Sequence, residues 1–182
     1  ADEYATEPKH NHKARFLWQH PTLAMFTNIE HDHPDIYPTV ESIVKVFEEF
    51  ALQIPSNGVL VGNGDNKYVS DIFQRMSCRT NTFGLSPKND YVIDRVHVSG
   101  NQTFFRAHAK EIDLGEFRLS VTGEHNALNA LGATVLALEA GLPLEKIKTA
   151  LATYSGSKRR LEYRGQLITG AHVFDDYAHH PT

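Results

Sequence analysis

The sequence has one cysteine, no long apolar run and no strong excess of charge, and each of these absences excludes a class of protein. A single thiol, Cys78, can form neither an internal disulfide nor a cysteine-rich zinc site, and we expect it to be inert and partly buried. This cysteine usage favours a cytoplasmic origin. No apolar stretch approaches the ~20 residues that a membrane span requires. The net charge of −4 gives no reason to expect a nucleic-acid or membrane partner.

A chain of 182 residues has room for one domain and the start of another. It begins Ala1-Asp2-Glu3-Tyr4, without an initiator Met or the basic and apolar regions of a signal peptide, and it stops at Thr182 without a tail. We therefore expect both ends to be cuts through a longer protein.

Short apolar runs alternate with amphipathic segments in the first half of the chain. The apolar runs are short and lack alternation, which is typical of strands buried on both faces of a parallel sheet. The amphipathic segments have helical spacing, and Thr39 is well placed as the N-cap of the first one. This order predicts an α/β fold, in which helices flank a mainly parallel sheet. The predicted strands are residues 23–26, 59–61 and 80–83, and the predicted helices are residues 39–53 and 66–76.

The composition then changes to β-forming residues separated by turns such as Ser99-Gly100-Asn101, which predicts a small antiparallel sheet appended to the main one. Helices return after it, with Gly141 expected as the C-terminal cap of the first and Pro143 as an early residue of the second. The further predicted strands are residues 91–98, 102–107, 116–121, 167–168 and 172–174, and the further helices are residues 124–140 and 143–153.

Two segments carry polar side chains at the end of a strand or the start of a helix. Residues 27–35 follow a predicted strand, and ligands of open α/β sheets bind beyond the carboxyl ends of strands. Their imidazoles and carboxylates suit a phosphate or Mg²⁺, although a solvated acidic turn has the same composition. Residues 123–130 open a helix, whose free N–H groups favour anions. Asn126 and Asn129 share one face there and match an adenine edge, although helix capping explains them equally well.

Two further segments lie near the carboxyl end of the chain. In Gly156-Ser157-Lys158-Arg159-Arg160, three cations follow a turn, and the arginine fork suits phosphate, although a solvated basic turn has the same pattern. In residues 173–182, a predicted apolar strand is followed by two carboxylates and two imidazoles. Asp175 could accept hydrogen bonds from ribose hydroxyls. The adjacent His179 and His180 point to opposite faces of an extended chain, and a dinuclear zinc hydrolase built on such groups is a rival interpretation.

Together the four segments resemble the Mur ligase family. Its members carry T-N-I-E-x-D-H, G-x-H-N-x-x-N-A, R-R-[FL]-E and D-D-Y-[AG]-H-H-P-T, and this chain matches them in the same order at residues 27–33, 123–130, 159–162 and 175–182. The resemblance spans nearly the whole chain. It implies the central ATP-binding domain of a cytoplasmic ligase of peptidoglycan synthesis. In the branch that this chain resembles most, ATP phosphorylates UDP-N-acetylmuramate, and L-alanine attacks the acyl phosphate.

The resemblance also implies roles for individual residues around the reacting groups. His33 would lie at a divalent metal, Mg²⁺, between ATP and the muramate carboxylate. Glu30 and Asp32 would support this loop, and Asn28 would lie close to the reacting groups.

The remaining implied roles concern ATP. Arg160, together with Arg159, would contact its phosphates, and Asp175 would hold its ribose. The residues on the adenine side would be His125, Asn126 and Asn129.

The sequence departs from the family pattern at its ends. The phosphate-binding loop of the family, G-x-[HT]-G-K-[ST], is absent and would lie upstream of Ala1. The glutamate that usually binds magnesium would lie there too, and Glu3 is expected to be a poor substitute. We expect residues 1–165 to form the central domain and residues 166–182 to begin the carboxy-terminal domain. Without the phosphate loop, we expect this chain alone to be inactive.

Two further alternatives to an alanine ligase remain open. The last motif is shared with the ligase that joins the tripeptide L-alanyl-γ-D-glutamyl-meso-diaminopimelate to UDP-N-acetylmuramate in wall recycling. A non-catalytic nucleotide-binding module would also retain these segments, and it predicts a gene that lacks the G-K-[ST] loop.

Overall fold

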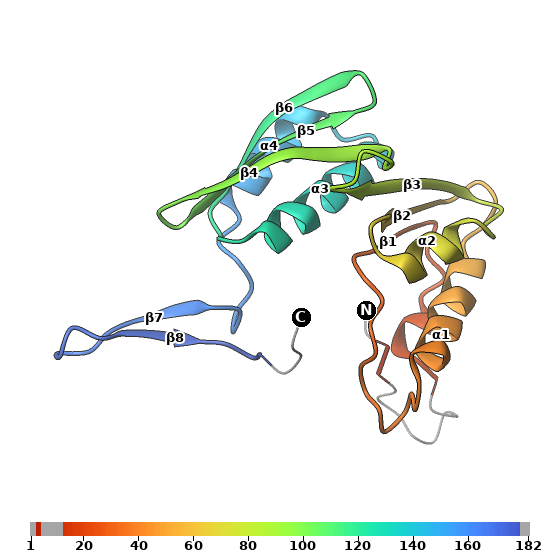
Figure 1. The fold of residues 1–182 in the computed structure, drawn as a ribbon, viewed down its shortest axis with the longest axis horizontal. Helices are drawn as coiled ribbons and strands as arrows, with labels where there is room; N and C mark the ends of the chain where they lie inside the picture. Colours follow the sequence, from red (N-terminus) through yellow and green to blue (C-terminus); the bar gives the residue numbers. More distant parts are fainter. Residues whose placement is uncertain (1–2, 5–12, 179–182) are drawn as a thin grey trace.

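The computed structural model describes residues 3–4 and 13–178, and its largest unit is a six-stranded sheet with helices on both faces (Figure 1). Strands β1 to β4 are parallel neighbours, and β4, β5 and β6 continue the sheet as an antiparallel meander. The hairpin β7-β8 forms a separate two-stranded sheet that extends away from the rest. The elements are η2 (Arg15–Trp18), β1 (Leu23–Phe26), α1 (Val40–Leu52), β2 (Val59–Asn63), α2 (Lys67–Phe73), β3 (Arg79–Gly84), β4 (Tyr91–Ser99), β5 (Gln102–Ala109), β6 (Ile112–Leu119), α3 (Glu124–Glu139), α4 (Leu144–Thr153), β7 (Glu162–Gln166) and β8 (His172–Asp175).

Helices lie on both faces of the parallel strands, and β2, which lies between β1 and β3, is the most completely buried of the three. Alternate residues of β1 and β2 point to opposite sides, as the strand geometry requires. Phe26 and Leu60 pack with α1 and α2, whereas Val61 packs with α3. This arrangement confirms the predicted α/β class. Strand β1 was predicted to be buried on both faces, but it is an edge strand and is fully buried on one face only. Ala24 and Phe26 are buried, while the alternate positions are partly exposed.

The local signals for helix α1 act as predicted. The Thr39 hydroxyl accepts a hydrogen bond from the Ser42 backbone N–H, and the Ser42 side chain accepts one from the Thr39 N–H, which completes a capping box. Ile43 and Phe50 are buried against the sheet, whereas Leu52, predicted on the same apolar side, is 64% exposed at the end of the helix. Gly141 has a φ of +83° directly after the C-cap of α3, as its predicted capping role requires.

The predicted antiparallel sheet is present, but it joins the main sheet directly. Only two residue pairs link β3 to β4, Phe83 with Tyr91 and Gly84 with Val92. The predicted strand at 167–168 is wrong, because these residues lie in the turn of the β7-β8 hairpin and are exposed, Ile168 completely so. The strand before this turn is β7, which is mostly polar. Within the described residues, no helix combines the length and the apolar character that crossing a membrane requires.

Candidate functional site

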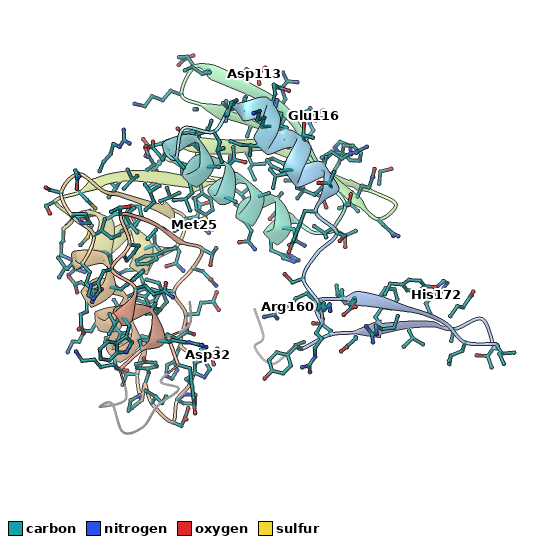
Figure 2. All side chains as sticks on the ribbon, turned by 180° about the vertical axis from the view of Figure 1, so that it is seen from behind. Met25, Asp32, Asp113, Glu116, Arg160 and His172 are labelled. Carbon is teal, nitrogen blue, oxygen red and sulfur yellow. The ribbon has the colours of Figure 1, made fainter. Side chains whose placement is uncertain are left out.

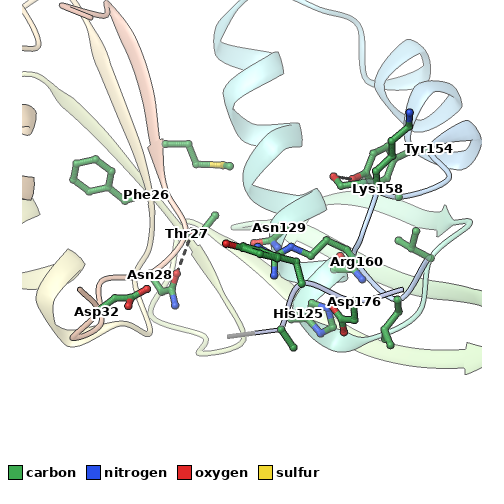
Figure 3. Close-up of a pocket in the computed structure, with 18 of the residues that line it drawn as sticks. Phe26, Thr27, Asn28, Asp32, His125, Asn129, Tyr154, Lys158, Arg160 and Asp176 are labelled. Atoms are coloured by element: carbon green, nitrogen blue, oxygen red, sulfur yellow. Dashed lines mark hydrogen bonds between the residues drawn. The ribbon is translucent and has the colours of Figure 1, made fainter. Parts of the chain in front are cut away.

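A broad open cleft of about 2820 Å³ separates the loop after β1 from the start of α3 and from the segment that leads into the hairpin. Figure 3 shows Asn28 and Asp32 on one side of this cleft and His125, Asn129 and Arg160 on the other. Figure 2 shows the same relation in the whole molecule, with Asp32 and Arg160 on facing sides. The cleft therefore lies at the carboxyl end of β1 and the amino end of α3, where open α/β sheets bind ligands.

The first wall is the loop that follows β1. Ile29 is buried in the core, and its carbonyl accepts a hydrogen bond of 3.2 Å from the Asn66 side chain, which also caps α2. On either side of Ile29, the Asn28 side-chain amide donates to Glu30 Oε1 over 2.9 Å. The buried residue fixes the loop, so both polar neighbours are held at the cleft.

The second part of this wall is a cluster of Glu3, Asp32 and His33. His33 Nε2 lies 3.6 Å from Glu3 Oε1 and 3.7 Å from Asp32 Oδ2. The His33 backbone N–H donates to Asp32 Oδ1 over 2.7 Å, and the rings of Tyr4 and His33 make a T-shaped contact with centroids 4.8 Å apart. His33 has a φ of +52°, a strained conformation for a residue with a side chain, and such strain is concentrated at functional sites.

The ligand atoms of this cluster, one from each residue, all lie within 4.8 Å of one another. Ligands around one Mg²⁺ at 2.0–2.1 Å lie at most about 4.2 Å apart, so a small contraction would bring all three to one ion. Two carboxylate oxygens suit magnesium, and the imidazole suits it less. The donor set therefore fits a divalent cation. It includes Glu3, which was expected from the sequence to be a poor substitute for the magnesium-binding glutamate.

The opposite wall is the first turn of α3. Gly123 precedes the helix with a φ of +112°, and a Cβ there would lie 2.6 Å from Cε1 of His125. Only glycine allows both this backbone and this close approach of the imidazole. The Asn126 amide donates to the Thr122 carbonyl over 2.7 Å, and Asn129 lies exposed one turn further on the same face. All three predicted adenine-side residues line the cleft.

The two predicted arginines separate in the structure. Arg160 lines the cleft. Arg159 is turned to the end of the hairpin, where its guanidinium lies 4.6 Å from the Tyr177 ring centroid and its Nε lies 3.8 Å from Asp175 Oδ1. Its backbone N–H donates to Glu162 Oε2 over 2.9 Å. This hydrogen bond, followed by the one from Arg164, lowers the pKa of the Glu162 carboxyl.

The predicted site residues are thus mostly, but not all, brought together. Arg159 and Asp175 do not line the cleft, whereas Asp176 does. His179 and His180, to which the sequence assigned no catalytic step, lie outside the described residues. The predicted residues that line the cleft are Asn28, Glu30, His33, His125, Asn126, Asn129 and Arg160.

Comparison with known proteins identifies the family of the chain. Residues 3–137 match the Mur ligase middle domain. The chain is 42% identical over 167 residues to the UDP-N-acetylmuramate–L-alanine ligase of Geobacter sp. (strain M21), an alignment that covers 92% of this chain and 36% of that protein. The chain therefore belongs to the Mur ligase family, and it spans about a third of the length of the curated relatives it matches.

Solved structures show the same fold. The UDP-N-acetylmuramate–alanine ligase of Thermotoga maritima superposes with a TM-score of 0.74 at 26% identity, over 88% of this chain and 36% of that one. The UDP-N-acetylmuramate:L-alanyl-γ-D-glutamyl-meso-diaminopimelate ligase of Neisseria meningitides gives a TM-score of 0.76 at 24% identity, over 87% of this chain and 48% of that one. The second likeness shows the fold alone.

Proposed function

We propose that this chain is the central ATP-binding part of a cytoplasmic ligase that joins L-alanine to UDP-N-acetylmuramate in peptidoglycan synthesis. The observation that carries the proposal is that separate motifs, from the loop after β1, the start of α3 and the turn before β7, line one cleft. The 42% identity to an alanine ligase supports the choice of amino acid. In this reaction ATP phosphorylates the muramate carboxylate, the L-alanine amine attacks the acyl phosphate, and ADP and phosphate leave.

The α3 wall would bind the nucleotide. Asn129 and Asn126 present amide donors and acceptors that suit the adenine edge, with His125 beside them. The Arg160 guanidinium would pair with phosphate oxygens, for which its planar fork is suited. This wall lies opposite the loop after β1, so a nucleotide held by α3 would direct its phosphates across the cleft.

The ribose contact is a choice between two neighbouring carboxylates. The contact proposed for Asp175 requires this side chain to leave the Arg159 guanidinium, 3.8 Å away. Asp176 already lines the cleft. Separate alanine substitutions of the two residues distinguish them. Only the loss of the residue that binds the ribose should weaken the binding of ATP more than the binding of a ribose-modified analogue.

Glu3, Asp32 and His33 would hold Mg²⁺ on the first wall. When bound, the cation would neutralise charge on the phosphates during phosphoryl transfer. The residues themselves orient the site, since Asp32 fixes the His33 backbone by a 2.7 Å hydrogen bond and Asn28 is paired with Glu30. Asn28 lines the same wall, and the family resemblance suggests that it would lie close to the substrate carboxylate.

We propose that the whole hairpin, and not only residues 166–182, begins the carboxy-terminal domain. Among the described residues β7 and β8 pair only with each other, and the expected boundary at residue 165 falls inside β7. Their apolar side chains are also exposed, as for Tyr163 and Phe174 at 54% and 56%. These observations support a boundary in the linker at residues 154–161.

The test of this function uses the complete ligase that contains this chain. We expect ADP release to depend on L-alanine, and we expect Asn129→Ala and Arg160→Ala each to raise the KM for ATP by about 10- to 100-fold through lost polar contacts. Arg118→Ala, which removes an exposed cation away from the cleft, serves as the matched control and should leave the KM unchanged. Unchanged KM values in both cleft variants would refute the ATP site.

The choice of amine and the activity of residues 1–182 alone need their own measurements. Stimulation by the murein tripeptide in place of L-alanine would reassign the substrate to the recycling ligase. A complete protein without ATP turnover would support a nucleotide-binding module instead. We further expect residues 1–182 alone to release no ADP, and ATP- and alanine-dependent ADP release from this chain would contradict that expectation.

A further inference from the structure

Thr103 is a fully buried polar residue at the start of β5, close to the proposed nucleotide wall but not part of it. Its side chain has 0% exposure, and the only other buried polar residue in the described part of the chain is Thr134. A buried hydroxyl is costly unless it is hydrogen-bonded, so its partners show what it stabilises. They belong to the segment that connects β6 to α3.

The hydroxyl bridges two backbone groups of that segment. Thr103 Oγ1 donates to the Val121 carbonyl over 2.8 Å and accepts from the Gly123 N–H over 3.0 Å. The backbone of Thr103 pairs with Leu119, the last residue of β6. The side chain therefore continues the sheet contact for four more residues, beyond the point at which the backbone ladder ends.

The backbone groups that this bridge holds in place support the side chains of the α3 wall. Gly123 is the N-cap of α3, and its carbonyl accepts from the Asn126 N–H over 3.1 Å. The Asn126 side chain is bonded to the Thr122 carbonyl, inside the bridged segment, and the His125 ring lies against Gly123. A shift of Gly123 would thus be transmitted to both side chains at the cleft.

We propose that Thr103 is a positioning residue, whose buried hydroxyl sets the start of α3 so that His125, Asn126 and Asn129 meet the nucleotide. This role rests on the proposed ATP site and deepens it. Thr103 itself touches no ligand, because it does not line the cleft. Because Thr103 acts through the geometry of α3, the loss of its hydroxyl must alter nucleotide affinity as well as stability.

Thr134 provides a matched control on the same helix. It is equally buried, but its hydroxyl donates only to the Ala130 carbonyl of its own helix, over 2.8 Å, and it does not line the cleft. Thr134→Val therefore removes a buried hydroxyl from α3 without releasing its first turn. The comparison separates a loss of stability from a loss of positioning.

The test measures KM for ATP, ADP affinity by calorimetry and Tm in the complete ligase. We expect Thr103→Val to raise the KM for ATP and the Kd for ADP by about tenfold, as the loss of bridging hydrogen bonds implies. Thr103→Ser should restore values close to wild type, because it retains the hydroxyl. Thr103→Cys, whose thiol is a weaker donor and acceptor, should lie between them and replaces the valine variant if that one fails to fold.

Two results would overturn the positioning role: a lower Tm with unchanged nucleotide constants in Thr103→Val (or in Thr103→Cys where it replaces that variant), or an equal rise in Kd for Thr134→Val. The proposed function fails separately. If wild type binds no ADP, or if Asn129→Ala binds it normally, the ATP site itself is absent. If Asn129→Ala weakens binding while the Thr103 variants do not, only the role of Thr103 is refuted.

Discussion

Replacing Gly132 with alanine sets helix propensity against packing, and the structure decides which effect is larger. Gly132 lies in the middle of α3, where alanine favours the helix by about 1 kcal/mol. A Cβ at this position would lie 2.6 Å from Cζ of Phe83 and 2.7 Å from Sδ of Met25, about 1 Å closer than normal contact. Met25 is flexible, but the Phe83 ring is 1% exposed and fixed in the core. Overpacking costs about 1–3 kcal/mol, and this overlap places the cost at the upper end.

We therefore expect Gly132→Ala to lose about 2 kcal/mol of unfolding free energy, which lowers the Tm by roughly 4–8 °C for a chain of this size. Urea and thermal unfolding of the chain measure this directly. Phe83→Leu offers a matched background, because the shorter side chain makes room for the methyl group. In that background the substitution should be neutral or stabilising. A Gly132→Ala variant that is more stable than wild type would refute the packing argument.

Three further outcomes follow from local contacts. Thr39→Ala should lower the unfolding free energy by about 1 kcal/mol in urea unfolding, because it removes the N-cap of α1, whereas Thr39→Ser should not. Burial raises the pKa of the Cys78 thiol, so at pH 8 iodoacetamide should alkylate the folded chain much more slowly than the denatured chain, and equal rates would contradict this. The hydrogen bond from the Arg159 N–H lowers the folded pKa of Glu162. The stabilisation that this bond gives the folded chain is therefore complete above the usual glutamate pKa of 4.5, and it is lost as the pH falls through the lower folded pKa. NMR titration of the Arg159 amide should show a midpoint below 4.5, and a midpoint at or above it would remove the proposed cause.

Strands β1 and β2 could be predicted because their apolar residues are consecutive in the sequence. Leu23–Phe26 was predicted with the observed bounds, and the Thr39 cap marked the start of α1. The hairpin could not be predicted in the same way. Leu167 and Ile168 are apolar but lie in an exposed turn, so a rule that equates apolar residues with buried strands fails there. Nothing in the described chain covers them, and the pattern of a strand depends on what packs against it.

The candidate site shows a similar division. Residues within one motif, such as Asn126 and Asn129, share a helix face, and the helix period alone brings them to the cleft. Glu3 is separated from His33 by 29 intervening residues, so only the tertiary fold shows that the two side chains lie 3.6 Å apart. Neighbouring residues of an extended chain point to opposite sides, and the sequence cannot show which of Asp175 and Asp176 faces the cleft.

The two sides of the proposed nucleotide site differ in how firmly the fold holds them. The start of α3 is fixed by the fully buried Thr103 hydroxyl and by the close packing of His125 on Gly123. The turn that carries Arg160 is held by exposed contacts, and its neighbours Arg159 and Leu161 have φ values of +59° and +48°. Exposed ion pairs contribute little, and strained residues persist only when their surroundings fix them. The proposed adenine side of the cleft is therefore held by more buried contacts than the proposed phosphate side, and we expect nucleotide binding to order the phosphate side more.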